Sequence, residues 1–353
     1  MNDLVKSAII KKLTIDLKGY KPSLSLSLYI GDIMKEKVLL LLKEGEYISG
    51  EKLSEILGVS RTAVWKSINS LRDEGYEIDS VTNKGYKLVK KPNVLNASAI
   101  SEGLNTKVVG TEIVTLKTVD STNEEIKRRA NENAESGLVV ISCEQTAGKG
   151  RLGRKWTSNE GGVYFSILLR PELPPSDISG ITLAAGMGVC LAIRKFTGLD
   201  AMIKWPNDVI IGNKKICGIL TEMTAQTDMV DFVVIGIGIN VLQESFPEEI
   251  AYKATSLKIE KKSEPDLSKL MHEVIAMLDK TILSYLFGIS QDDLKLYKSM
   301  CATISREVSL SRNGEKLSGK AIDITPDGEL VVCLDDGKRI NVNSGEVTVQ
   351  GIY

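Results

Sequence analysis

The residues best suited to chemistry lie at positions 148–156, GKGRLGRKW, where glycines alternate with cations and a tryptophan ends the run. The three glycines let backbone amides approach an anion, and the four Lys or Arg side chains repel one another unless an anion lies among them. The apolar, β-branched residues 138–143 come just before and predict a buried strand. The pattern therefore predicts a loop at a strand end that binds a phosphate.

Two other interpretations of this loop compete with the first. Gly148, Gly150 and Gly153 also fit the G-x-G-x-x-G pattern of a dinucleotide-binding loop, which opens an apolar helix. Residues 154–162 are instead polar and rich in turn formers, so a dinucleotide loop is disfavoured. A solvated basic surface loop is the remaining alternative.

Length and composition limit the classes of protein that the chain can belong to. A chain of 353 residues with 42% apolar residues predicts two or three domains with sizeable cores. Since 45 Lys and Arg residues nearly balance 46 Asp and Glu residues, DNA binding would need a local patch. The five cysteines are widely spaced and form no C-x-x-C pair, which indicates reduced thiols rather than a disulfide frame or a zinc site. With no signal peptide and no apolar run near about 18 residues, we expect a cytoplasmic protein without a membrane partner.

His272 is the only histidine in the chain. It lies in a helical pattern at residues 267–278, and we expect it at the helix surface or boundary. A Ser-His-Asp triad would have to use it, and His-rich metal sites are excluded. Catalysis should therefore depend on cations, carboxylates and positioning.

Residues 35–90 show the pattern helix, helix, turn, helix, hairpin. Gly58 ends the second helix and Ser60 is placed to cap a third helix at 61–71, which is helix-turn-helix spacing over 51–70. The alternating residues 76–88 add a β-wing. We expect a buried face of Ala63, Val64, Ile68 and Leu71, and DNA contacts from Arg61, Thr62, Trp65, Lys66 and Asn69 on the helix and Lys84 on the wing.

The charge of this segment is small for a DNA-binding domain. Residues 35–90 hold ten Lys or Arg and nine Asp or Glu, a net charge of +1. A dimer would double the contacts with phosphate. The alternative is a winged helix that is used only for protein contacts.

The first 33 residues differ in pattern from the helix-turn-helix segment beside them. They include the alternating run 23–30, which predicts one amphipathic strand, and no residues suited to chemistry. The segment from Met34 onward would make sense as the start of the protein, so we interpret residues 1–33 as an optional extension. N-terminal sequencing of the native protein tests this, and a product that begins at Met1 would contradict it.

Residues 95–295 mix strands and helices. Strands are predicted at 113–119, 162–170, 201–211, 214–222 and 232–241, and an apolar helix at 183–196. Ser121 or Thr122 could serve only to cap a helix. Gly236 and Gly238 mark places where a ligand or another backbone could approach. Short strands at 307–310, 317–322, 330–334 and 346–349, with turns at 313–314, 326–328 and 336–337, predict a small barrel of SH3 type.

Four motifs resemble those of a known family. They are DSTN at 120–123, EQTAGKGRLGRKW at 144–156, KWPND at 204–208 with KICGIL at 215–220, and GIGIN at 236–240. From Met34 to the end, the chain resembles the bifunctional biotin operon repressor and biotin protein ligase family. The resemblance implies an α+β protein with an extension (1–33), a winged helix-turn-helix domain (34–91), a mixed α/β catalytic domain that binds biotin and ATP (92–298) and an SH3-like β-barrel (299–353).

The resemblance also implies an AMP-forming biotin–[biotin carboxyl-carrier protein] ligase. ATP and Mg²⁺ would serve the formation of biotinyl-5′-AMP, and the acceptor would be a lysine of the biotin carboxyl carrier protein of acetyl-CoA carboxylase. The adenylate would also act as corepressor, ordering the basic loop and promoting a homodimer that binds operator DNA. A basic segment that repels itself when empty would order when filled.

Roles for individual residues follow from the matched motifs. Biotin would be bound by Ser121, Thr122, Asn123, Gln145, Lys149, Gly150, Arg151 and Lys215, and ATP or the adenylate by Arg154, Trp156, Lys204, Asn207, Asp208 and Asn240. Arg151 and Lys215 would be catalytic, and Asp208 would hold Mg²⁺ through ATP. Lys149 replaces a common arginine, Leu152 a frequent cation, and Gln350 an arginine able to reach the nucleotide.

Two alternatives of different classes remain. A winged-helix transcription regulator could sense a small ligand without turnover and would release neither AMP nor pyrophosphate. A lipoyl-type ligase on a related catalytic fold is disfavoured by the winged helix and by KWPND beside the full basic loop.

Overall fold

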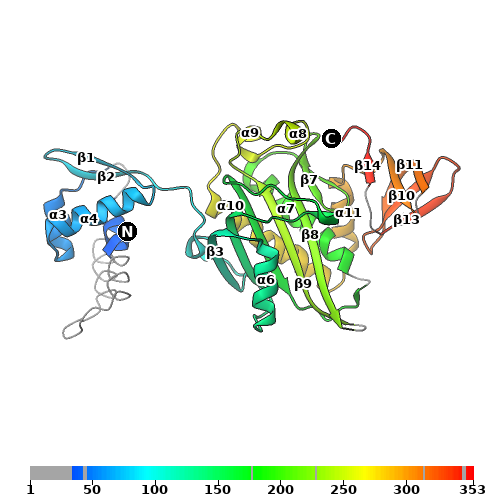
Figure 1. The fold of residues 1–353 in the computed structure, drawn as a ribbon, viewed down its shortest axis with the longest axis horizontal. Coiled ribbons are helices and arrows are strands. Elements are labelled where there is room, and N and C mark those ends of the chain that lie inside the picture. Colours follow the sequence, from blue (N-terminus) through cyan, green and yellow to red (C-terminus); the bar gives the residue numbers. More distant parts are fainter. Residues whose placement is uncertain (1–33, 43–45, 176–177, 227–228, 313–314, 344–346) are drawn as a thin grey trace. The chain divides into compact units, whose positions relative to one another are not determined.

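The computed structural model describes residues 34–42, 46–175, 178–226, 229–312, 315–343 and 347–353 (Figure 1). The chain divides into two compact units, Met1–Asn93 and Val94–Tyr353. The predicted extension 1–33, its alternating run 23–30 and the turn at 313–314 lie outside the described residues. Each unit is described by itself.

The first unit has the predicted helices and hairpin. They are a helix at 34–41, α3 (Gly50–Leu57), α4 (Arg61–Asp73), β1 (Glu77–Val81) and β2 (Gly85–Lys90). Gly58 ends α3 with a φ of 66°, and the Ser60 hydroxyl accepts a hydrogen bond from the Ala63 amide at 3.2 Å, as predicted. Val64, Ile68 and Leu71 of α4 are buried with Val38, Leu53 and Leu88. Ala63 is only half-buried, and Ser67 completes the inner face.

The second unit is built on a seven-stranded sheet. Its strands, in spatial order, are β3 (Glu112–Val119), β4 (Leu138–Gln145), β5 (Gly162–Leu169), β9 (Met229–Asn240), β8 (Lys214–Gln226), β7 (Asp208–Ile211) and β6 (Ala201–Lys204). Only the β3–β4 pair is parallel. The predicted strand 201–211 is in fact two strands, because a turn at 205–207 folds β7 back on β6 with Lys204 opposite Asp208. That turn brings the KWPND motif to a sheet corner.

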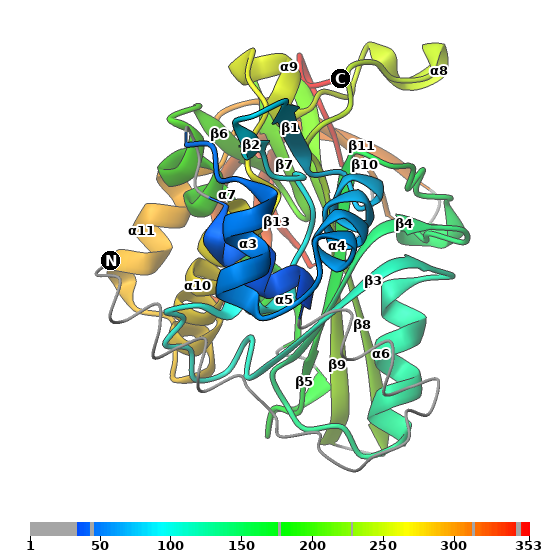
Figure 2. The ribbon, with the colours of Figure 1, turned by 90° about the vertical axis from the view of Figure 1, so that its left-hand side faces the viewer.

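Helices cover both faces of this sheet. Figure 2 shows α7 (Ile178–Thr197) and α10 (Leu267–Leu286) on one face and α6 (Thr122–Asn131) on the other. Two cores result: a large one with α7 and α10, and a smaller one in which Ile126 and Ala130 of α6 pack on the opposite face. The shorter helices are α5 (Ala97–Ser101), α8 (Glu248–Ala251), α9 (Leu257–Lys261) and α11 (Gln291–Met300). His272 on α10 lies half-buried at a boundary, with its Nδ1 2.9 Å from the Ile100 carbonyl oxygen, as expected.

Helix α7 corrects the expectation that no apolar run approaches the length of a membrane span. By length and composition, its residues 180–197 could cross a membrane. The structure buries 67% of that window within the protein, where Ile181, Val189 and Ile193 pack in the large core. A helix that is apolar nearly all round is what a buried core position favours.

The C-terminal residues form a five-stranded antiparallel sheet that shares the large core. Its order is β13 (Arg339–Val342), β12 (Leu330–Leu334), β11 (Glu315–Ile324), β10 (Glu307–Arg312) and β14 (Val347–Val349). Strand β13 was not predicted, because only two of its four residues are apolar. The Trp205 indole donates a hydrogen bond to the Gly328 carbonyl at 2.9 Å, and the Trp205 amide donates to the Thr303 hydroxyl at 3.0 Å. These contacts fix the KWPND turn against the C-terminal sheet.

Candidate active site

A cavity of about 580 Å³ opens at the end of the seven-stranded sheet where β4 runs into the basic loop. Its walls come from the start of α6, the loop 148–156, the turn at 205–207, the first half of β8, the end of β9, and the last residues of the chain. All fourteen residues predicted to bind biotin or ATP line it: Ser121, Thr122, Asn123, Gln145, Lys149, Gly150, Arg151, Arg154, Trp156, Lys204, Asn207, Asp208, Lys215 and Asn240. Residues spread over 120 positions of sequence thus meet at one cavity.

The start of α6 presents polar groups to this cavity. Ser121 is the N-cap residue by position, but its side chain makes no capping hydrogen bond, so capping does not account for its hydroxyl. The Thr122 amide and hydroxyl both donate to the Gln145 side-chain oxygen, at 2.8 and 3.1 Å. The Gln145 amide group then donates to the Ser158 hydroxyl at 2.8 Å. These bonds hold donors and acceptors in fixed directions, as recognition of a polar ring requires.

Asn123 is held from both sides. Its Nδ2 donates to Glu222 at 2.6 Å, and its Oδ1 accepts from the Ser166 hydroxyl at 2.5 Å. Ser158, Ser166 and Glu222 were not predicted from the sequence. A serine inside the otherwise apolar strand 162–169 was a usable signal, because a fully buried hydroxyl needs a hydrogen-bond partner.

The basic loop folds on itself. Lys149 pairs with Lys155 in an antiparallel bridge, and the Gly150 amide donates to the Arg154 carbonyl at 2.7 Å. A single 3-10 turn, Arg151–Gly153, forms the tip, where Leu152 has a φ of 58° and is 73% exposed. Two turn residues in succession with positive φ close the loop tightly. This geometry spreads the cations in different directions.

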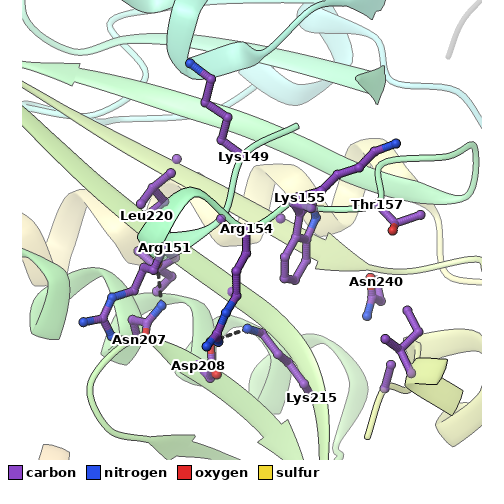
Figure 3. Close-up of a pocket in the computed structure, with 18 of the residues that line it drawn as sticks. Lys149, Arg151, Arg154, Lys155, Thr157, Asn207, Asp208, Lys215, Leu220 and Asn240 are labelled. Carbon is purple, nitrogen blue, oxygen red and sulfur yellow. Dashed lines mark hydrogen bonds and ion pairs between the residues drawn. The ribbon is translucent and has the colours of Figure 1, made fainter. Parts of the chain in front are cut away.

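Figure 3 shows where those cations point. Arg151 reaches Asn207, whose Oδ1 accepts a hydrogen bond at 2.9 Å, and Arg154 extends toward Asp208. Lys149 points the opposite way and pairs with Glu124 of α6 at 2.8 Å. The hydrogen bond from Lys149 is the main cause that lowers the pKa of Glu124. The structure therefore places Arg151 and Arg154 over the cavity and turns the Lys149 amino group outward, so its predicted contact with the biotin carboxylate stays a prediction.

The Trp156 indole lies against glycines of β8 and β9. A Cβ atom added at Gly238 would lie 2.6 Å from the indole nitrogen, and one added at Gly218 would lie 2.9 Å from the ring. At Gly236 an added Cβ would collide with the Asn123 side chain. The close approach predicted for these glycines therefore comes from side chains of the protein itself. The Trp156 N–H is buried, and the described residues offer it no hydrogen-bond acceptor.

Charged groups gather at the KWPND turn. Lys215 on β8 pairs with Asp208 at 2.6 Å, and both line the cavity near Lys204. Burial is the main cause that lowers the pKa of Lys204, to about 8, and the nearby Lys215 and Lys253 lower it further while Asp208 opposes them. Three lysines around one carboxylate leave an excess of positive charge, which suits a phosphate chain.

The surroundings of Asp208 do not fit a magnesium ligand. One carboxylate oxygen takes the Lys215 amino group at 2.6 Å, and the other accepts the Tyr353 hydroxyl at 2.8 Å. Across the described ranges, no group of three or more His, Cys, Asp or Glu side chains could hold a metal ion. The nearby lysines would also repel a divalent cation. Asp208 is therefore the ion-pair partner of Lys215, and its predicted role in holding Mg²⁺ does not fit these contacts.

The C-terminal sheet reaches the cavity through a residue that the motifs did not predict. Gln350 does not line the cavity; its side chain is exposed and its backbone bonds to Glu307 and Arg306. Tyr353 lines the cavity instead, with its ring centroid 3.5 Å from the Lys204 amino group. Nothing in its sequence context signals this contact, since 145 residues separate Tyr353 from Asp208.

The first unit presents most of its predicted DNA contacts to solvent. Arg61, Thr62, Lys66 and Lys84 are exposed, and Trp65 on α4 is 53% exposed. Asn69 is half-buried and accepts a hydrogen bond from Arg72 at 3.4 Å. The Lys84 and Lys87 amino groups lie 5.9 and 5.0 Å from the Tyr47 ring centroid, which steadies the wing.

Models of known protein families match separate parts of the chain. The sequence model of the Biotin/lipoate A/B protein ligase family matches residues 115–240, an HTH domain model matches 35–87, and a Biotin protein ligase C terminal domain model matches 303–349. Together with the cavity, these matches define a class: a protein ligase of the biotin and lipoate type that also carries a DNA-binding domain.

Relatives narrow the class further. The chain is 39% identical to the bifunctional ligase/repressor BirA of Bacillus spizizenii over 310 residues, 86% of this chain and 95% of the relative. It is 33% identical to that of Escherichia coli over 321 residues, 88% of this chain and 97% of the relative. The biotin protein ligase of Aquifex aeolicus in complex with biotin and ATP superimposes with a TM-score of 0.60 at 31% identity, over 68% of this chain and 99% of that one.

The chain therefore belongs to the family of bifunctional biotin ligase/repressor proteins. Its activity is that of a biotin protein ligase, and its helix-turn-helix domain is that of a repressor. The alternative of a regulator without turnover is set aside, because the catalytic and C-terminal ligase domains are both present.

Proposed function

We propose that the cavity joins biotin to ATP and that the resulting biotinyl-5′-AMP both feeds protein biotinylation and controls DNA binding. The observation that supports this best is the meeting of all fourteen motif residues at one cavity of about 580 Å³. A hydrogen-bonded polar end lies at Thr122 and Gln145, and a cationic end lies at Lys204 and Lys215. One end suits a neutral polar ring, and the other suits phosphates.

The chemistry needs no nucleophile from the protein. The biotin carboxylate attacks the α-phosphorus of ATP, a carboxyl–phosphate bond forms, and the bond to the β-phosphate oxygen breaks to release pyrophosphate. An uncharged lysine amine of the acceptor then attacks the acyl carbon, AMP leaves, and the amine loses its proton. Two anions must meet in the first step, so fixed cations and amides provide the main stabilisation.

The residues divide between the two ends of the cavity. Ser121, Thr122, Asn123 and Gln145 would bind the biotin ring, while Arg151 and Arg154 would face the new carboxyl–phosphate linkage. The Gly150 amide would join them after it releases the Arg154 carbonyl. Lys204, Lys215, Asn207 and Asn240 would serve the phosphates and the nucleotide, and Trp156 would cover the adenine from its position against Gly218 and Gly238. Magnesium would arrive bound to the phosphates of ATP, not on Asp208.

The acceptor would be a biotin carboxyl carrier domain of acetyl-CoA carboxylase. A curated relative from Mycobacterium tuberculosis, 32% identical over 235 residues, is named biotin–[acetyl-CoA-carboxylase] ligase. A carrier lysine needs an open cavity mouth, and the exposed tip at Leu152 lies beside it. This chemistry and the five free cysteines suit a cytoplasmic enzyme.

Biotinylation of a carrier domain tests the enzymatic proposal. Incubation with labelled biotin, ATP and an isolated carboxyl carrier domain should release AMP and pyrophosphate and label one carrier lysine. Omission of the carrier should leave biotinyl-5′-AMP on the protein. Biotin binding without pyrophosphate release would contradict the proposed reaction.

Regulation would couple the same adenylate to the winged helix. Biotinyl-5′-AMP would order the loop 148–156 and favour a homodimer, which places two copies of α4 on a palindromic operator. The net charge of only +1 on residues 35–90 makes such a pair necessary for tight binding. Acceptor protein and operator would then compete for one complex.

Gel shifts with operator DNA test this coupling. We expect binding to tighten when biotin and ATP are both present, and Lys66→Ala to weaken binding at every sequence and to reduce the salt slope by about two, one for each copy in the dimer. Lys52→Ala is the matched control, since this exposed α3 lysine pairs with Glu55 and should change little. Equal affinity with and without biotin and ATP would refute the coupling.

A further inference from the structure

The last residues of the chain enter the active-site cavity. Val347, Thr348, Ile352 and Tyr353 line it, and Ile352 is buried in the large core. The Ile352 amide donates to the Val349 carbonyl at 3.2 Å, and the Tyr353 amide donates to the Asn213 carbonyl at 3.3 Å. The buried neighbour and these backbone bonds fix the direction in which the Tyr353 side chain leaves the chain.

The Tyr353 side chain contacts two residues of the KWPND motif at once. Its hydroxyl donates to the Asp208 Oδ2 atom at 2.8 Å, while the Asp208 Oδ1 atom takes the Lys215 amino group at 2.6 Å. Its ring centroid lies 3.5 Å from the Lys204 amino group, within the range of a cation–π contact. One phenol therefore sets the rotation of the carboxylate and covers the neighbouring lysine.

These two contacts decide how positive charge is presented to the cavity. Lys204 is 9% exposed, and the charged groups that face it are Asp208 on β7, Lys215 on β8 and Lys253 after α8. Without the bond from Tyr353, Asp208 could rotate and turn its released Oδ2 atom toward the phosphates or toward Lys204, which would cancel charge that the reaction needs. The hydroxyl of Tyr353 prevents that rotation by holding Oδ2.

We propose that Tyr353 is a positioning residue for the adenylation step, which orients Asp208 through its hydroxyl and covers Lys204 with its ring so that Lys204 and Lys215 face the nucleotide phosphates. The inference rests on the proposed function. It assigns the C-terminal sheet a direct part in the first half-reaction through a residue other than Gln350. Transfer from a preformed adenylate involves no pyrophosphate departure and should depend on Tyr353 much less.

Two substitutions in the full chain separate the two contacts. Tyr353→Phe keeps the ring on Lys204 but loses the bond to Asp208, and we expect biotin-dependent exchange between pyrophosphate and ATP to fall about tenfold to a hundredfold. Tyr353→Leu loses both contacts, and its exchange rate should fall at least as far. Transfer of biotin from added biotinyl-5′-AMP to a carrier domain should stay within about twofold of wild type in both variants. Gln350→Ala, on the same segment, is the control and should match wild type in both assays.

The pH dependence distinguishes positioning from loss of structure. Burial is the main cause of the lowered pKa of Lys204, so opening this site to water in Tyr353→Leu should raise that pKa. The wild type should lose apparent affinity for ATP as pH rises through about 8, since Lys204 loses its charge there. Both variants should move this alkaline limb to higher pH: Tyr353→Leu by opening Lys204 to water, and Tyr353→Phe by freeing Asp208 to approach Lys204.

Three outcomes would overturn the inference. Unchanged exchange in both variants would exclude the role of Tyr353 while leaving the enzyme intact. Equal loss of exchange and transfer, with no change in the pH profile and a lowered melting temperature, would show a structural role only. A wild-type chain that forms no biotinyl-5′-AMP would instead refute the proposed function, and the inference with it.

Discussion

Arg151→Ala should reduce the rate of biotinyl-5′-AMP formation by about a hundredfold to a thousandfold, the range seen when a fixed charge-stabilising donor is removed from an active site. Arg151 is the loop cation that reaches across the cavity, where it bonds to Asn207 at 2.9 Å. Both biotin and ATP bring negative charge to this part of the cavity. Without the Arg151 guanidinium, the repulsion between the carboxylate and the phosphates is no longer offset by its positive charge. Single-turnover formation of the adenylate, followed by release of labelled pyrophosphate, measures the effect.

The control for this prediction is the neighbouring residue. Leu152 is 73% exposed at the loop tip, and Leu152→Ala should change the rate little. Neither substitution should lower the melting temperature by more than a few degrees, because neither side chain packs in a core. Adenylate formation by Arg151→Ala at the wild-type rate would remove Arg151 from the site.

Gly238→Ala should weaken adenylate binding by about tenfold to a hundredfold through sterics alone, the equivalent of 1–3 kcal/mol of overpacking. A methyl group at this position would lie 2.6 Å from the indole nitrogen of Trp156. The indole must then move or the strand must shift, and in both cases the surface on which Trp156 rests is changed. Titration of the adenylate, with tryptophan fluorescence as the signal, measures the affinity.

A second glycine provides the matched control. At Gly186, on α7, the nearest atom to an added Cβ would be 3.8 Å away, so the methyl group finds ordinary contact distance. Gly186→Ala should leave affinity unchanged and should stabilise the fold slightly, because alanine favours a helix over glycine by about 1 kcal/mol. If Gly238→Ala bound the adenylate as tightly as Gly186→Ala, the packing of Trp156 on β9 would not matter for binding.

The outward position of Lys149 suggests how the loop could exchange conformations. Glu124 accepts both Lys149 and Lys127, at 2.8 and 3.1 Å, and both lysines are partly exposed. Exposed ion pairs of this kind contribute about 0–1 kcal/mol, so a bound adenylate could recruit Lys149 at small cost. The pair would then hold the loop near α6 without preventing its rearrangement on ligand binding.

The sequence by itself determined the order of domains and fourteen of the residues that line the cavity. Glycine and cation spacing at 148–156 predicted an anion site, the caps at Gly58 and Ser60 predicted the helix-turn-helix, and four short motifs indicated the family. These features are local: a cap, a turn or a glycine acts through neighbours within a few positions, so its residue type is visible in the sequence. For this reason most strands and helices around the site were also predicted, with errors at their ends: α7 begins five residues before the predicted 183, and β8 ends four residues after the predicted 222.

Only the tertiary structure decided the partners of those residues. It split the strand 201–211 at the KWPND turn, tied Asn123 to Glu222 and Ser166, turned Lys149 outward, and placed Tyr353 rather than Gln350 in the cavity. Each of these contacts depends on side chains that the sheet brings together from 25 to 145 positions apart. Hydrogen bonds and ion pairs of such range follow from strand order and burial, which residue types alone do not specify. The site's composition was therefore readable from the chain, whereas its charge arrangement came from the fold.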